Sequence, residues 1–138
     1  MYINNYYAYR INRCEGRSLV TEGIHDIRKG LENIRKSSSN ISDDNVSLGK
    51  ADILEGLIDI ESGLRYIIDG LFRLSLIPNS KIDKQTGKGI DNIKSGSSDI
   101  RNGLKDMRND NISEWIIGVN EKIHYIEEGI NDITSVLR

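Results

Sequence analysis

Glycine recurs at every seventh position of this chain, inside segments that otherwise have the pattern of an α-helix. Residues 49–74, for example, read GKADILEGLIDIESGLRYIIDGLFRL. Each such glycine is usually followed by Ile or Leu and, three residues later, by another apolar side chain, as in GLENI at 30–34 and GINDI at 129–133. Apolar residues at alternating spacings of three and four form a helical stripe and not a strand.

The phased glycines lie beside that stripe, at heptad position g when the stripe is assigned to a and d. Inside a helix each glycine costs about 0.8–1 kcal/mol relative to alanine, so roughly eight of them cost on the order of 6–8 kcal/mol. Close packing between glycine columns would offset this cost, because g positions of antiparallel helices face each other and let the backbones approach below ~8–10 Å. We therefore predict a helix-packing role for Gly23, Gly30, Gly56, Gly63, Gly70, Gly89, Gly96, Gly103 and Gly129.

Breaks in the stripe predict four helices within one domain spanning residues 1–138, near 17–36, 48–76, 81–109 and 113–137. The polar stretch SSSNISDDNVS at 37–47 is typical of a loop, and Pro78 ends the second helix. Ser80-Lys-Ile-Asp83 resembles a capping box for the third helix, and Ser113 followed by Glu114 is typical of the start of the fourth. Residues 1–16 are either an aromatic arm or an extension of the first helix back to about residue 5.

Charge alternates from one predicted helix to the next. Residues 1–36 carry seven basic and four acidic side chains, 47–77 carry three and five, 81–110 seven and five, and 113–138 two and five. An up-down-up-down order would place opposite net charges on neighbouring helices. We therefore predict an all-α, antiparallel up-down-up-down four-helix bundle with glycine-lined contacts.

Two sets of glycine pairs are possible, because each set is symmetric about one of the predicted connections between helices. Gly70 with Gly89, Gly63 with Gly96 and Gly56 with Gly103 are symmetric about residues 79–80, between the second and third helices. The alternative set is symmetric about the first loop and pairs Gly30 with Gly56, Gly23 with Gly63 and Gly16 with Gly70. We favour the pairing of the second and third helices, because their connection is expected to be the tighter one.

Both histidines lie in Glu-x-x-His sequences, Glu22 to His25 and Glu121 to His124. Di-iron carboxylate four-helix bundles use two such motifs, together with a glutamate from each remaining helix, and all of these ligands face inward. Here the heptad phase places the glutamates at f and the histidines at b, on the solvent side. We interpret all four as surface residues, keep a surface or intermolecular metal contact as the alternative, and expect no buried metal and no cofactor.

No other pattern favours catalysis, and we predict that the protein is not an enzyme. The register places neither histidine near Cys14, for which a small buried residue is the more common role. Ser97 falls at position a among aliphatic residues, where its hydroxyl is expected to bond back to its own helix. Gly87-Lys88-Gly89 lacks the strand and the spacing of a phosphate-binding loop.

Two groups of apolar or aromatic residues fall outside the four-helix core and are candidates for an interface. Four tyrosines lie within the first nine residues and could form an arm that packs on the bundle or on another subunit. The predicted second helix has an extra apolar face, which either receives this arm or meets a second copy of the protein. The residues concerned are Tyr2, Tyr6, Tyr7, Tyr9, Leu54, Ile58, Ile68 and Phe72.

Composition narrows the function classes. The chain has 138 residues, 37% of them hydrophobic, a net charge of −2 and one cysteine, so it cannot form an internal disulfide and carries no strong charge for nucleic acid or anionic lipid. No apolar run approaches the ~20 residues of a membrane span, no signal peptide is visible, and a cytoplasmic location is expected. The twenty-three isoleucines and thirteen asparagines suggest an AT-rich genome, such as that of a low-GC bacterium or its phage.

These observations favour a non-catalytic structural or protein-interaction bundle, such as a homodimer or a component of a bacterial or phage assembly. One alternative is a small-molecule or metal-binding four-helix bundle. A further alternative is a membrane-surface or regulatory partner binder that opens to expose its helices.

The packing role of the phased glycines predicts that Gly63→Leu destabilises the fold severely. Gly118→Leu should be mild, because Gly118 is out of phase with the glycine column. Urea unfolding followed by circular dichroism measures both effects, and equal tolerance at the two positions would contradict the close-packing hypothesis.

Overall fold

A computed structural model describes residues 2–41, 45–77, 82–108 and 110–138, with side-chain positions from Arg10 onward. Four α-helices and a short 3₁₀ helix make up its regular structure: α1 (Tyr2–Asn40), α2 (Val46–Ser75), α3 (Lys84–Asp106), α4 (Ile112–Thr134) and η1 (Ser135–Leu137). The described residues contain no strand. The all-α, four-helix prediction is therefore confirmed.

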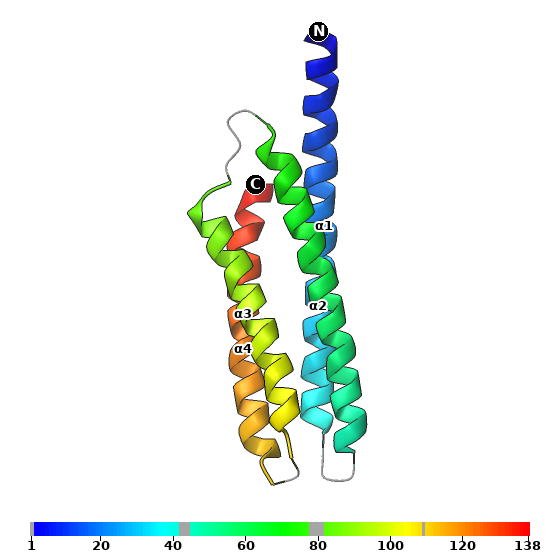
Figure 1. The fold of residues 1–138 in the computed structure, drawn as a ribbon, viewed down its shortest axis with the longest axis vertical. Coiled ribbons are helices and arrows are strands. Elements are labelled where there is room, and N and C mark those ends of the chain that lie inside the picture. The colour runs from blue at the N-terminus through cyan, green and yellow to red at the C-terminus, as the bar shows by residue number, and fades with distance from the viewer. Residues whose placement is uncertain (1, 42–44, 78–81, 109) are drawn as a thin grey trace.

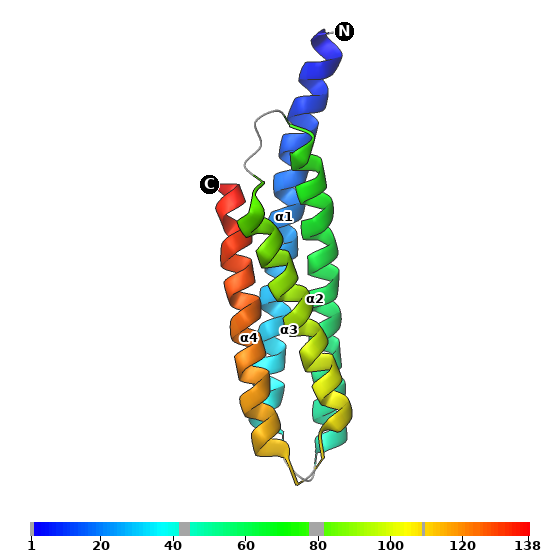
Figure 2. The ribbon, with the colours of Figure 1, turned by 60° about the vertical axis from the view of Figure 1, so that its left-hand side comes forward.

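The helices lie side by side as two hairpins, α1 with α2 and α3 with α4 (Figures 1 and 2). Successive helices run in opposite directions, and the N-terminal end of α1 projects beyond the rest of the bundle. The apolar stripes of all four helices meet in one core. Its most deeply buried large side chains are Ile27, Leu31, Ile34, Ile53, Leu57, Ile60, Ile67, Ile93, Ile100, Met107, Ile123 and Ile126.

The first helix is longer at both ends than the sequence predicted. It begins at Tyr2, so residues 2–16 are not a separate arm, and it continues to Asn40 through part of the stretch assigned to a loop. The serine-rich segment stays helical because the stripe continues through it. Ser38 and Ile41, three residues apart, occupy stripe positions and are buried, although the sequence there is mostly polar.

The other boundaries shift by a few residues. Helix α3 starts at Lys84 and not at 81, because Asp83 is its N-cap and accepts hydrogen bonds from the backbone N–H (3.1 Å) and the hydroxyl (3.2 Å) of Thr86. Ser80, the other half of the predicted capping box, lies outside the described residues. After α3, the Asn111 side chain accepts from the Arg108 N–H and donates to the Asp106 carbonyl oxygen, which stabilises the turn into α4.

Glycines of α1 and α2 pack directly on one another. A Cβ placed on Gly23 would lie 2.3 Å from the carbonyl oxygen of Gly63, and a Cβ on Gly63 would lie 2.5 Å from the carbonyl oxygen of Gly23. Gly30 with Gly56 and Gly16 with Gly70 make the same reciprocal contacts, at 2.5–2.9 Å. Because real Cβ atoms do not approach other atoms below 3.0 Å, this helix pair requires glycine at these positions.

The preferred pairing of glycines between the second and third helices is therefore wrong, and the alternative is right. The physical reason lies in the connections. Because α1 continues to Asn40, only five residues separate it from α2, whereas eight separate α2 from α3. The tighter connection thus joins the first two helices, and the g side of α2 faces α1.

Helices α3 and α4 share the glycine contact over only part of their length. Gly89 and Gly129 are reciprocal partners, with Cβ-to-carbonyl distances of 2.7 and 2.6 Å. In the next two heptads of α4 the corresponding positions hold Lys122 and Trp115. A Cβ on Gly96 would meet Ile126 at 2.6 Å, and one on Gly103 would meet only the Trp115 indole, at 3.0 Å. The Gly96 Cβ would also lie 3.1 Å from the Lys122 carbonyl oxygen, so a backbone contact persists there, and only at Gly103 is the neighbouring atom solely a side chain.

Ion pairs connect each helix to its neighbours around the bundle. They are Glu15 with Arg73 (α1 and α2), Glu61 with Arg101 (α2 and α3), Asp99 with Lys122 (α3 and α4), and Arg35 with Glu127 (α1 and α4). All of these side chains are substantially exposed, so each pair contributes only about 0–1 kcal/mol. Two of the pairs, Arg35 with Glu127 and Glu61 with Arg101, follow the alternation of net charge along the sequence, whereas in the other two the acidic residue comes from the net-basic helix. The ion pairs therefore do not by themselves determine the order of the helices.

Candidate interaction surface

A second heptad stripe runs along the outside of α2, separate from the stripe that fills the core. We define this outer stripe as Leu54, Ile58, Glu61, Arg65, Ile68 and Phe72, at successive spacings of four, three, four, three and four residues. Its apolar members, all predicted as interface candidates, are exposed by 38%, 58%, 39% and 62% in chain order. This spacing is that of a coiled-coil seam. Ile58 and Phe72 face solvent, whereas Leu54 and Ile68 are partly covered.

The centre of the outer stripe is charged. Glu61 accepts two hydrogen bonds from the guanidinium of Arg101 on α3, at 2.6 and 3.1 Å. Arg65, one turn further along α2, is exposed. The prediction from sequence named only the four apolar residues of this stripe. The signal for the other two was available, since Glu61 and Arg65 complete the three-and-four spacing between Ile58 and Ile68.

The N-terminal segment does not cover this surface. Residues 2–9 continue α1 as a helix, and Figures 1 and 2 show this end extending away from the bundle. The side chains of Tyr2, Tyr6, Tyr7 and Tyr9 lie outside those that the structure describes, so their predicted interface role stays a prediction. Two occupants were predicted for the extra apolar face of α2, the chain's own N-terminal arm and a second copy of the protein. The first is wrong, because residues 2–9 extend away from the bundle.

The histidines lie on the solvent side, as the heptad phase predicted. His25 and His124 are exposed, as are Glu22 and Glu121. His124 lies 3.0 Å from Glu128, one turn further along α4, and not against Glu121. Among the described side chains, no group of three or more His, Cys, Asp or Glu residues is placed to hold a metal ion.

The two candidate nucleophiles have different outcomes. Ser97 is buried, and its hydroxyl donates to the Ile93 carbonyl oxygen at 2.8 Å, which confirms the predicted bond within its own helix. Cys14 was expected to be buried, and this expectation is wrong because the residue is exposed. It lies at heptad position e of α1, two residues before Gly16, which packs against Gly70 and Leu74 near the C-terminal end of α2.

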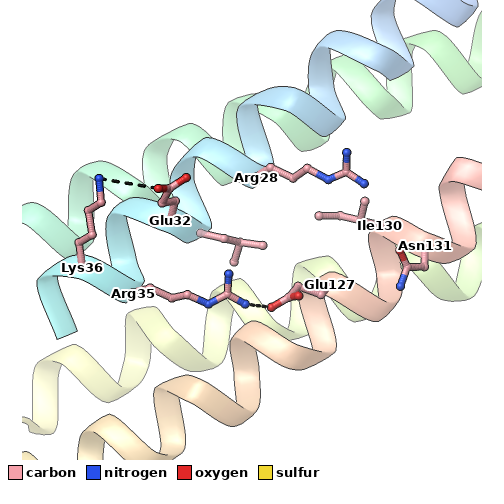
Figure 3. Close-up of a pocket in the computed structure, with 8 residues that line it drawn as sticks. Arg28, Glu32, Arg35, Lys36, Glu127, Ile130 and Asn131 are labelled. Carbon is pink, nitrogen blue, oxygen red and sulfur yellow. Dashed lines mark hydrogen bonds and ion pairs between the residues drawn. The ribbon is translucent and has the colours of Figure 1, made fainter. Parts of the chain in front are cut away.

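A groove of about 560 Å³ lies between α1 and α4 (Figure 3). Its floor is apolar, from Leu31 and Ile130, and its rim is charged. Most of the rim charges neutralise one another, through the ion pairs of Arg35 with Glu127 and of Lys36 with Glu32. Arg28 extends over the floor toward Ile130 and Asn131 in Figure 3. One unneutralised arginine on a mixed-charge rim does not define a class of ligand.

A smaller hollow of about 140 Å³ lies between α3 and α4, where side chains replace the glycine contact. Gly103, Trp115, Gly118 and Val119 contribute to its lining. A Cβ on Gly118 would meet nothing within 4 Å, consistent with a glycine that has no packing role. The hollow is a local consequence of the missing glycine contact and lies outside the outer stripe.

Comparison with models of protein families, with curated proteins and with solved structures finds no match for this chain. Its helices are amphipathic, and none of the described ones has the length and apolar composition to cross a bilayer. The outer stripe of α2 is therefore the feature on which a functional interpretation rests.

Exposure of the outer stripe predicts that its apolar residues are dispensable for folding. We expect Ile58→Ser to change the free energy of unfolding by less than about 0.5 kcal/mol in dilute solution. The matched variant Ile60→Ser, two residues away at a fully buried position, should cost several kcal/mol, because it leaves a cavity and buries a hydroxyl. Urea unfolding of both variants at low protein concentration checks this difference. Similar large losses for both would show that Ile58 belongs to the core.

Proposed function

We propose that this protein is a non-catalytic interaction module, a four-helix bundle that binds a protein partner through the outer stripe of α2. The observation that carries the proposal is a complete heptad seam on a helix whose other seam already fills the core. Apolar side chains at heptad spacing gain stability by packing against another helix, and those of the outer stripe keep between 38% and 62% of their surface exposed.

The rigidity of the α1–α2 hairpin supports this role. Reciprocal glycine contacts join α2 to α1 at three successive heptads, so the outer stripe is presented on a helix with a fixed backbone. A preorganised surface loses less conformational entropy on binding than a flexible one. The partner's side of the contact should be an amphipathic helix, since the seam requires knobs at the same three-and-four spacing.

The proposal places the protein in a structural or assembly role, in keeping with the bacterial or phage assembly suggested by its composition. The exposed histidines, Cys14 and the groove between α1 and α4 have no part in it. Specificity would come from the charged centre of the stripe, because Glu61 and Arg65 disfavour a partner that places like charges opposite them.

Affinity capture with the tagged full-length chain tests the proposal in cells that encode it. The double variant Ile58→Glu/Phe72→Glu puts two carboxylates on the outer stripe and should lose the proteins that the wild type retains. The matched control is Ile117→Glu/Tyr125→Glu, which changes two residues of similar exposure on α4. Circular dichroism should show unchanged helicity for both double variants.

The expected result is loss of specific capture, including capture of untagged copies of the chain, with the α2 variant alone. Equal capture by the wild type and both variants would overturn the proposed role of the outer stripe. Loss of capture with the α4 variant alone would move the interaction surface to α4.

A further inference from the structure

We infer that the partner of the outer stripe is the same stripe on a second copy of this chain, with the two α2 helices antiparallel. This inference rests on the proposed function and names the partner of that surface. It is carried by the order of residues along the stripe. When two copies of the stripe run in opposite directions, apolar residues face apolar residues and acidic residues face basic ones.

The stripe is symmetric about residue 63. When two α2 helices are aligned antiparallel around this point, Leu54 of one copy lies opposite Phe72 of the other, and Ile58 lies opposite Ile68. Glu61 of each copy then lies opposite Arg65 of the other. Every layer of the seam therefore joins either two apolar side chains or two opposite charges.

The heptad positions agree with this arrangement. The stripe alternates between positions e and b of the core register, which act as the a and d positions of the second seam. Antiparallel coiled coils place a residues of one helix opposite d residues of the other. Each of the three kinds of layer pairs an e residue with a b residue, as an antiparallel seam requires.

A parallel arrangement is disfavoured by charge. In parallel seams, a faces a and d faces d, so Glu61 would face Glu61 and Arg65 would face Arg65 in adjacent layers. Like charges held opposite one another are destabilising. The charged centre thus selects the antiparallel order, and it also disfavours a shift of register by one heptad, which would place an apolar residue against a charge.

Neighbouring side chains do not occupy the charged centre fully. Glu61 is bound by Arg101 through one carboxylate oxygen, Oε1, and both hydrogen bonds that Arg101 donates go to that atom. The Arg65 guanidinium is exposed on the next turn of the same face. A second copy would add Arg65 to the Glu61–Arg101 pair, giving each carboxylate two guanidinium partners.

The extent of the stripe sets the expected strength of the contact. From Leu54 to Phe72 it spans nineteen residues, with a rise of about 27 Å along the helix. A single pair of helices of this length buries less surface than a standard protein interface, so we expect a dissociation constant in the range of about 10–100 µM.

Sedimentation velocity over a range of concentrations tests self-association directly. The full-length chain should shift from monomer to dimer, and Ile58→Glu/Phe72→Glu should remain monomeric at every concentration. Arg65→Glu alone should weaken the dimer by at least about tenfold, because two attractive contacts become repulsive. An equimolar mixture of Arg65→Glu with Glu61→Arg should restore association, since only the mixed dimer places opposite charges in both central layers.

Cross-linking tests the register. In a Cys14→Ser background, chains with Ile58→Cys and chains with Ile68→Cys should form a disulfide when mixed and oxidised, because positions 58 and 68 lie opposite each other. Either variant alone should cross-link poorly, since ten residues, or about 15 Å of helix, separate identical positions along the seam. Efficient 58–58 and 68–68 cross-links would overturn the antiparallel order.

The outcomes separate this inference from the proposed function. A wild type that stays monomeric to several hundred micromolar would overturn the inference, while partner capture that depends on the outer stripe would still support the proposed function. A dimer that is unaffected by changes in the stripe would also overturn the inference, and the proposed function would be contradicted as well only if partner capture were unaffected by the same changes.

Discussion

The structure depends on the contact between the backbones of paired glycines. At Gly23 and Gly63 the carbonyl oxygen of each residue occupies the space that a Cβ on the other would need. At this separation the two backbones are in direct contact, and the isoleucine one turn beyond each glycine packs over the partner glycine. Dispersion over the close contact offsets the helix propensity that the glycines give up.

This contact determines the rest of the architecture. Because the g side of α2 is used against α1, its e side must face α3, where longer side chains such as Glu61 and Arg101 meet. The bundle therefore consists of two hairpins, with three glycine pairs between α1 and α2 and one between α3 and α4, joined by a core of isoleucine and leucine. The same assignment leaves the b positions of α2 on the outside and the e positions at the border with α3, and the outer stripe runs along this edge. The candidate interaction surface is thus a consequence of which side of α2 the glycines occupy.

Heptad phase was sufficient to predict four helices, the stripe positions and the exposed sides of His25 and His124. It could not choose between two symmetric glycine pairings, since both satisfy the same spacing. The choice depended on the length of the first loop, and this length depended on whether α1 continues through Ser38. The polar composition of this stretch predicted a loop, but Ser38 is buried at a stripe position of the helix. The charged centre of the outer stripe was missed for a similar reason. Glu61 and Arg65 are charged, so a search for exposed apolar residues passes over them, and only their heptad spacing identifies them as members of the stripe.

The most direct test of the glycine contact is the sign of a glycine-to-alanine change. Alanine is the better helix former by about 0.8–1 kcal/mol, so Gly118→Ala, which meets no neighbouring atom, should raise the free energy of unfolding by up to that amount. Gly63→Ala should instead lower it by several kcal/mol, because the new methyl group would overlap the Gly23 carbonyl oxygen at 2.5 Å. Urea unfolding of the two variants measures both values. Opposite signs are the predicted result, and an increase in stability at both positions would contradict the account.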